Sequence, residues 1–346
     1  MLKFESSQLY FTGIVGTGGI GSGKFFKLNG NQTLGREESR SGHLLDIKDY
    51  CKQHIILHYI KVLLGSSFSV LPIGKLGDDE TGKALYNEMR STGFIMDRVE
   101  TIPNVPTLFS FCFYYPDGSG GNMTTDNSAS SFVNSAFIEK AGSDIKNLGP
   151  KGIILAVPEV PMQARQTLLE NGKKNGLFCA ASFTSGEIPD AIQSGVFSYI
   201  DLLAINYDEA SAIAGLTLYD SDIPNVVHSA IEKLKPFNES IHVSVTAGKK
   251  GSWCWDGQNL KHYPAISTNV VSTAGAGDAF FSGLLIGTSL GLHLFESQQI
   301  GSVIAGLSVT SPHTINREID RCALSEFVRT TNSGLSEKIL KLLEDK

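Results

Sequence analysis

A run of mostly small residues at positions 272–280 contains the side chain that is best suited to take part in catalysis. Gly275 and Gly277 allow an anion to approach the backbone, and Asp278 follows them at once. Apolar residues at helical spacing come next, and the unpaired first amides of a helix, with its dipole, favour an anion. Because a carboxylate would repel that anion, Asp278 is either a base that removes a proton from an attacking hydroxyl or an ordinary N-terminal residue of its helix.

The same run resembles the signature D-T-x-G-A-G-D-x-F of the ribokinase-like (PfkB) family of carbohydrate and nucleoside kinases. Residues 272–280 read S-T-A-G-A-G-D-A-F, so the leading Asp alone is replaced, by Ser272. The resemblance implies that Asp278 is the catalytic base and that backbone amides form an anion hole for the transferred phosphoryl group. The anion-hole residues it implies are Ala274, Gly275, Ala276 and Gly277.

Composition narrows the class of protein. With 346 residues, 41% hydrophobic and 18% charged, the chain suits one large α/β domain with an appendage. The net charge of -6 argues against a general nucleic-acid binder. Five scattered cysteines, without a C-x-x-C pair, indicate buried residues in a reducing compartment. There is no secretory leader pattern and no bilayer-spanning run, so we expect a cytoplasmic protein with no membrane partner.

A second glycine cluster, at residues 16–24, contains two overlapping nucleotide-binding patterns. Gly16, Gly18 and Gly21 satisfy the dinucleotide pattern G-x-G-x-x-G. The cluster also satisfies the P-loop pattern G-x-x-x-x-G-K, but Phe25 stands where a P-loop has the Ser or Thr that binds Mg²⁺.

Each of these patterns requires a helix immediately after it. Residues 25–32 instead hold an aromatic pair and an Asn-Gly turn, which favour a β-hairpin. An NAD(P)-dependent oxidoreductase that uses residues 16–21 remains one alternative, and it requires a helix over residues 22–35 and no lid. A kinase-shaped binding or regulatory protein without turnover is the other alternative.

In the family that the motif resembles, the first strand leads to substrate-contacting residues and to a small β-sheet lid. The resemblance implies a single kinase domain over residues 1–346, a three-layer α/β/α fold doubly wound around a mostly parallel sheet. It implies a lid formed by about residues 22–40 and 105–126. Residues 107–115 are aromatic and rich in β-formers, and an exposed apolar strand favours association, so we also expect a homodimer through the lid.

Two positions that contact the sugar in that family are altered here. An Asp that commonly follows the first strand aligns with Gly21. A G-G-x-x-x-N segment that opens the first long helix aligns with residues 41–46, which read S-G-H-L-L-D, and helical spacing predicts that helix over residues 44–64. The substrate site is therefore rebuilt, and the sequence does not name the phosphate acceptor. Its candidate residues are Gly42, Asp46 and Arg40.

The charge near the lid suggests one class of acceptor. A carboxylate is missing at Gly21, and the basic residues Lys24, Arg36 and Arg40 lie in or beside the lid. Arginine is well shaped to bind carboxylate or phosphate, which favours an anionic acceptor such as a sugar acid or a phosphorylated sugar. The alternative is that these three are solvated surface residues.

Asn206 and Glu209 lie three apart where a strand runs into a helix. One interpretation is a helix N-cap with its capping-box glutamate. The other follows from resemblance to the family's N-x-x-E motif, which implies that the pair helps to hold Mg²⁺ directly or through water. Oxygen ligands suit Mg²⁺, which keeps most of its waters.

The same resemblance also implies which residues bind the nucleotide. A strand at 242–245 ends in T-A-G-K-K-G, similar to the T-x-G-x-x-G turn beside the nucleotide, and a small-residue helix at 300–309 matches the helix that walls the adenine. The implied activity is ATP- and Mg²⁺-dependent phosphorylation of a hydroxyl on a small sugar or related molecule. The cofactor-binding candidates are Thr246, Gly248, Gly251, Ala274, Ser302 and Ala305.

Overall fold

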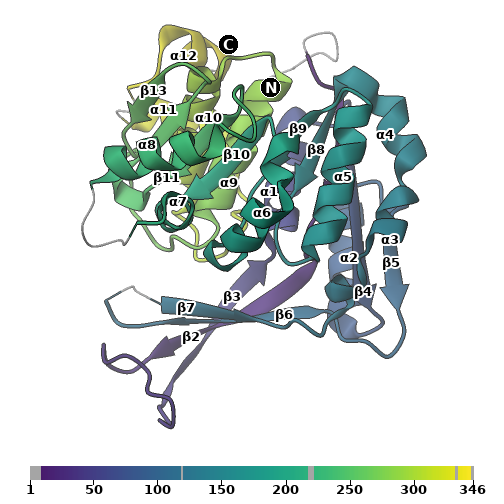
Figure 1. Ribbon diagram of the computed structural model, residues 1–346. Coiled ribbons are helices and arrows are strands. Elements are labelled where there is room, and N and C mark those ends of the chain that lie inside the picture. The colour runs from purple at the N-terminus through teal and green to yellow at the C-terminus, as the bar shows by residue number, and fades with distance from the viewer. Residues whose placement is uncertain (1–8, 118–119, 217–221, 332–333, 344–346) are drawn as a thin grey trace.

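The computed structural model describes residues 9–117, 120–216, 222–331 and 334–343. These residues form a large body, in which helices cover both faces of a nine-stranded sheet, and a separate four-stranded sheet that projects from it (Figure 1). The predicted three-layer α/β fold with a small β-sheet lid is therefore confirmed.

The large sheet is parallel except at one edge. The pairs from β5 across to β11 are parallel, and β12 and β13 join antiparallel. Central strands are covered on both faces, so they read as continuous apolar runs, and β8 is buried at every position. In spatial order the strands are β13 (Leu260–Tyr263), β12 (Ser252–Trp255), β11 (His242–Thr246), β10 (Leu202–Asn206), β9 (Phe178–Ala181), β8 (Gly152–Ala156), β1 (Gly13–Thr17), β4 (Ser69–Gly77) and β5 (Val99–Ile102).

The helices pack as two groups over two hydrophobic clusters. Successive strand residues point to opposite faces, so Ile14 joins one cluster and Val15 the other. Within the described ranges, none of the helices has the length and apolar character needed to cross a membrane. The first group is α1 (Lys52–Leu64), α2 (Glu80–Thr92), α9 (Ala276–Ser289), α10 (Leu294–Ser308), α11 (Arg321–Thr330) and α12 (Glu337–Leu343); the second is α3 (Ser135–Glu139), α4 (Gly142–Leu148), α5 (Met162–Lys174), α6 (Ile188–Ser194), α7 (Tyr207–Ala214) and α8 (Ile223–Leu234).

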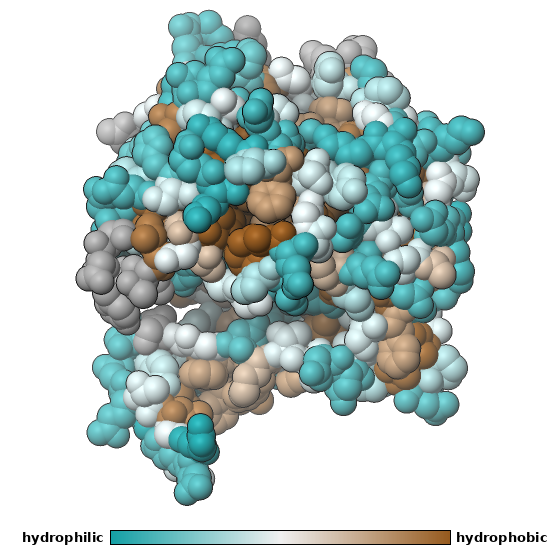
Figure 2. All heavy atoms as spheres, in the orientation of Figure 1, coloured by the Kyte–Doolittle hydropathy of each residue, from teal (hydrophilic) through white to brown (hydrophobic). Residues whose placement is uncertain are grey.

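The small sheet stands at the carboxyl end of β1. That strand ends at Thr17 and β2 begins at Gly21, so the chain enters the small sheet directly from this edge. Figure 2 shows the surface hollowed between the small sheet and the body. We call this small sheet the lid sheet; its strands in spatial order are β3 (Gly42–Tyr50), β2 (Gly21–Leu28), β6 (Leu108–Tyr114) and β7 (Gly120–Thr124).

The prediction of a helix over residues 44–64 is wrong in its first part. Residues 42–50 form strand β3, which pairs antiparallel with β2, and the helix begins only at Lys52. Leu44, the first residue of the predicted helix, is 64% exposed on the lid sheet. The lid sheet consequently includes β3, which the predicted ranges 22–40 and 105–126 left out.

The glycine cluster at residues 16–24 runs from β1 into β2, and residues 22–35 contain no helix. The oxidoreductase alternative required that helix and no lid, so it is wrong. The glycines are needed for packing instead. A Cβ at Gly18 would lie 2.4 Å from a Val157 methyl carbon, and one at Gly19 would lie 2.5 Å from the Cβ of Glu159.

Candidate active site

Helix α9 begins at Ala276, and Gly275 is its N-cap with a left-handed φ of 78°. A Cβ at Gly275 would lie 2.6 Å from the carbonyl oxygen of Thr314, so both conformation and space require glycine there. Gly277 is exposed, and a Cβ on it would meet nothing within 4 Å. The amide of Ala276 donates to the carbonyl of Thr273, but the space beside Gly277 in the first turn of α9 is open, so an anion has room to approach there.

Asp278, in the first turn of α9, is paired with Lys52, the first residue of α1. Oδ1 of Asp278 and Nζ of Lys52 are 3.3 Å apart, and the side chains are 14% and 31% exposed. The charge of Asp278 is the main reason that the pKa of Lys52 is raised. Sequence reasoning missed Lys52 because it began the helix eight residues too early.

Further carboxylates face this pair. Glu159 follows β8 with a φ of 76°, and its Oε2 is shielded from solvent without a hydrogen-bond partner in the described chain. Burial raises the pKa of Glu159 to about 7, and the Lys52 ammonium opposes the rise. Glu209 at the start of α7 is 6% exposed, and burial raises its pKa too, again opposed by Lys52. Lys52 thus lies among three acidic side chains.

Asn206 and Glu209 form the capping box that was one of their two interpretations. The amide of Glu209 donates to Oδ1 of Asn206 at 2.9 Å, and the amide of Asn206 donates to Oε2 of Glu209 at 2.8 Å. Among the described residues there is no cluster of three or more His, Cys, Asp or Glu side chains that could hold a metal ion. The pair can thus contribute at most a few of the oxygen atoms around Mg²⁺.

A cavity of about 760 Å³ opens beside the T-A-G-K-K-G turn. Thr246 and Gly248 line it, together with Lys249 and Lys250, whose ammonium groups supply positive charge. Gly251 closes the turn with a φ of 90°, and a Cβ there would lie 2.1 Å from the carbonyl oxygen of Tyr263. Asp208 and Asp222 also line the cavity, so its two lysines are balanced by two carboxylates, and positive charge is concentrated only at the turn.

Three other nucleotide-side candidates, Ser302, Ala305 and Ala274, do not line that cavity. Ser302 is buried in α10, and its hydroxyl donates to the carbonyl of Gln298 at 3.0 Å. Ala305 is half-buried, one turn further along the same helix. Ala274 lies just before α9, and its amide donates to Oγ of Ser272 at 3.3 Å, so Ser272 stabilises the anion-hole turn locally.

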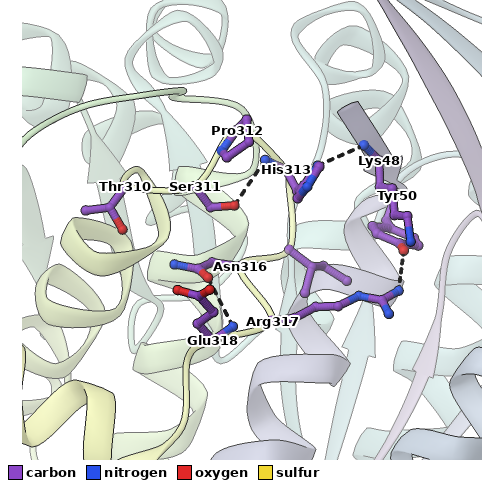
Figure 3. Close-up of a pocket in the computed structure, with 10 residues that line it drawn as sticks. Lys48, Tyr50, Thr310, Ser311, Pro312, His313, Asn316, Arg317 and Glu318 are labelled. Atoms are coloured by element: carbon purple, nitrogen blue, oxygen red, sulfur yellow. Dashed lines mark hydrogen bonds between the residues drawn. The ribbon is translucent and has the colours of Figure 1, made fainter. Parts of the chain in front are cut away.

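The end of β3 is tied to the loop after α10, which lines a second cavity of about 390 Å³ (Figure 3). The amide of Lys48 donates to Nδ1 of His313 at 3.1 Å, and the amide of Tyr50 donates to Oγ1 of Thr314 at 3.0 Å. Thr314 is also the residue against which Gly275 packs. This loop therefore connects the lid sheet to the anion-hole turn.

The predicted substrate residues lie in or just before β3 and not at the start of α1. Gly42 and Asp46 lie in β3 of the lid sheet, where Gly42 pairs with Leu28 and Asp46 is exposed. Arg40 precedes that strand and is bound to Glu38 and to the carbonyl of Gln32. The alignment of residues 41–46 with the start of the first helix is therefore wrong, because α1 begins at Lys52.

The class that these features define is a three-layer α/β protein of the ribokinase-like kind, with a β-sheet lid over the carboxyl ends of its parallel strands. The solved structure of ribokinase from Giardia lamblia has the same fold, with a TM-score of 0.78 at 17% identity over 91% of this chain and 99% of that one.

Sequence comparison gives the family. The pattern of the pfkB family carbohydrate kinases matches residues 57–321, more than half of the chain, so the chain belongs to this family. Ribokinase of Lactococcus lactis is 22% identical over 237 residues, 68% of this chain and 72% of the relative. Adenosine kinase of Saccharomyces cerevisiae is 25% identical over 254 residues, 69% of this chain and 72% of the relative. The chain is accordingly a carbohydrate or nucleoside kinase.

Proposed function

We propose that this protein transfers the γ-phosphoryl group of ATP to a hydroxyl of a small carbohydrate or related metabolite, with Asp278 as the general base. The observation that carries the proposal is the position of Asp278 in the first turn of α9, beside the open space at Gly277. A base and an anion site must adjoin if an attacking hydroxyl is to lose its proton while charge grows on the transferred group.

The residues present fit a nucleotide with its metal ion. Lys249 and Lys250, at the turn that borders the cavity, can contact phosphates, and the open space at Gly277 suits the transferred group. Glu209 has one oxygen outside its capping bond and would hold Mg²⁺ directly or through water, with Asn206 beside it. Mg²⁺ bound there would neutralise charge on the phosphates.

In this proposal each residue has a limited role. Asp278 accepts the proton of the acceptor hydroxyl, and Lys52 holds the carboxylate in place through their ion pair. The amides of Gly275 and Gly277, at the positive end of α9, stabilise the negative charge of the group in transfer, whereas those of Ala274 and Ala276 donate to Ser272 and Thr273. The lid sheet closes over the acceptor and keeps water from competing as the nucleophile.

An ADP-production screen with Mg-ATP tests the proposal. The panel holds free sugars, sugar acids, sugar phosphates and nucleosides, and each positive result is confirmed by finding the phosphorylated product. We expect at least one acceptor to raise ADP release well above the rate with water alone. Thermal unfolding in the presence of Mg-ATP gives a second readout, because a bound nucleotide raises the melting temperature by mass action. No stabilisation by Mg-ATP and no product from any acceptor would reject the proposal.

We also propose that two copies pair through their lid sheets. Leu44 and Met123 are 64% and 58% exposed, and Phe26 and Phe111 lie between them with ring centroids 6.0 Å apart. These four side chains form a continuous apolar face, and Figure 2 shows hydrophobic residues gathered on the lid sheet. Sedimentation of wild type and of Leu44→Lys/Met123→Lys tests this: the pairing is rejected if both sediment as monomers at micromolar concentration.

A further inference from the structure

Positions 21 and 23, at the start of β2, have no room for a side chain. A Cβ at Gly21 would lie 2.4 Å from the carbonyl oxygen of Leu108, which pairs with it in the lid sheet. A Cβ at Gly23 would lie 2.1 Å from Oδ2 of Asp49 and 2.4 Å from Oγ of Ser110. The space next to Gly23 is thus filled by a carboxylate from the neighbouring strand.

Asp49 is the register partner of Gly23 in β3, three residues before Lys52. It is 7% exposed, and Ser110 donates its hydroxyl to Oδ2 at 2.8 Å, with the Cys112 thiol at 3.7 Å. Burial raises the pKa of Asp49, and these hydrogen bonds oppose the rise. The Tyr50 backbone and the Thr314 side chain also favour the charged form of Asp49, but the Ser110 and Cys112 contacts are both made to Oδ2, so a further hydroxyl group would donate to Oδ1.

Asp49 belongs to the same electrostatic cluster as the proposed base. Burial raises the pKa of the Cys51 thiol, and the carboxylates of Glu159, Asp49 and Asp278 each raise it further, so all three act on one point at the start of α1. Lys52 is paired with Asp278 at this point.

The net charge of this cluster stays negative when the remaining charged neighbours are included. Glu209 adds a fourth carboxyl group that acts on Lys52. The buried Arg165 acts on Glu159, but it is already paired with Glu187, so that pair is neutral as a whole. The region around Lys52 is therefore acidic on balance.

We infer that the acceptor is an uncharged polyhydroxylated compound, and that Asp49 binds its hydroxyls. This inference rests on the proposed kinase function and names the acceptor class for the same site. A carboxylate or phosphate on the acceptor would be repelled by the acidic groups around Lys52, whereas neutral hydroxyls can donate to them. We do not propose the anionic acceptor that Lys24, Arg36 and Arg40 suggested, because Arg40 is paired with Glu38, and Lys24 and Arg36 are exposed to solvent.

Charge-matched acceptors test the inference with wild-type enzyme and Mg-ATP. One pair is D-glucose with D-gluconate, a second is D-fructose with fructose 6-phosphate, and neutral pentoses and nucleosides complete the panel. We expect the best kcat/KM for a neutral compound and at least about tenfold less for its charged counterpart, which corresponds to a difference of about 1.4 kcal/mol. A better rate with the anionic member, or no turnover of any neutral compound while Mg-ATP still stabilises the protein, overturns the inference. No stabilisation by Mg-ATP would reject the proposed function instead.

The variant Asp49→Asn tests the residue, because the amide keeps the shape and can still accept from Ser110. We expect KM for the neutral acceptor to rise about tenfold or more with KM for ATP unchanged. Asp126→Asn, the same change at an exposed site after β7, is the matched control and should leave both values alone. An unchanged acceptor KM in a folded Asp49→Asn protein, judged by its melting temperature, contradicts the assignment of Asp49.

Discussion

The ammonium group of Lys52 lies 3.3 Å from the carboxylate of Asp278, which joins the first turn of α1 to the first turn of α9. The two residues are 226 positions apart in the sequence. This ion pair fixes the carboxylate that we propose as the base, in a region where Glu159 and Glu209 would otherwise repel it.

Replacing Lys52 should therefore lower turnover without unfolding the protein. We expect Lys52→Met to reduce kcat by roughly tenfold to a hundredfold, because the carboxylate loses its positioning partner. Lys52→Arg, which keeps the charge, should recover part of the rate. The measurement is the steady-state kinetics of the two variants and of wild type. Equal kcat values in all three would show that Lys52 does not position Asp278.

The two glycines of the anion-hole turn should respond differently to alanine. Gly275→Ala places a Cβ in a left-handed conformation and against Thr314, so we expect it to lower stability by about 1–3 kcal/mol as well as activity. Gly277→Ala meets no protein atom, so we expect a nearly unchanged melting temperature but weaker kinetics, since the methyl group enters the space for the anion. Wild-type kinetics in Gly277→Ala would show that this space is not used.

Glu209→Gln separates the two roles of the N-x-x-E pair. Its amide oxygen can still accept from the backbone of Asn206, so the capping box and the melting temperature should change little. Loss of the charge should raise the Mg²⁺ concentration for half-maximal activity several-fold, if the side chain helps to hold the ion. Asn206→Ala is the complementary variant, expected to cost about 1 kcal/mol of stability through the lost cap. An unchanged Mg²⁺ dependence in Glu209→Gln would leave capping as the role of Glu209.

Glu159 should make stability depend on pH. Burial raises its pKa to about 7 from a usual value of 4.5, so between these values the folded protein binds more protons than the unfolded chain. Its contribution therefore falls as pH rises through that window, and the loss is complete above pH 7. Glu159→Gln should gain about 2 kcal/mol relative to wild type between pH 5 and pH 8. Denaturant unfolding at both pH values measures this, and parallel pH dependence of the two proteins would contradict it.

Much of the fold could be predicted from local patterns. The buried run of β8 and the small-residue turn before α9 carry their signals within a few residues, and both are where the sequence indicates. Four of the five cysteines are buried as expected, and Cys322 is exposed. Such features depend on short-range chemistry, which a sequence displays directly.

The residues around the proposed acceptor site could not be predicted, because their positions depend on pairing between distant segments of the chain. Residues 42–50 have apolar spacing that also fits a helix, and only their hydrogen bonds to β2 make them a strand. Once that strand was missed, Lys52 and Asp49 could not be recognised as neighbours of Asp278. Glu159 gave no local signal either, since its role follows from the position of β8 beside β1.

The turnover of the Asp278→Asn variant tests most directly whether Asp278 is the general base. The amide keeps the size of the side chain but cannot accept the proton of the attacking hydroxyl. We expect a kcat at least about a hundredfold lower than wild type, with ATP affinity little changed because the cavity beside residues 246–251 and the first turn of α9 remain. Near-wild-type turnover in a folded Asp278→Asn protein would contradict the assignment of Asp278 as the base.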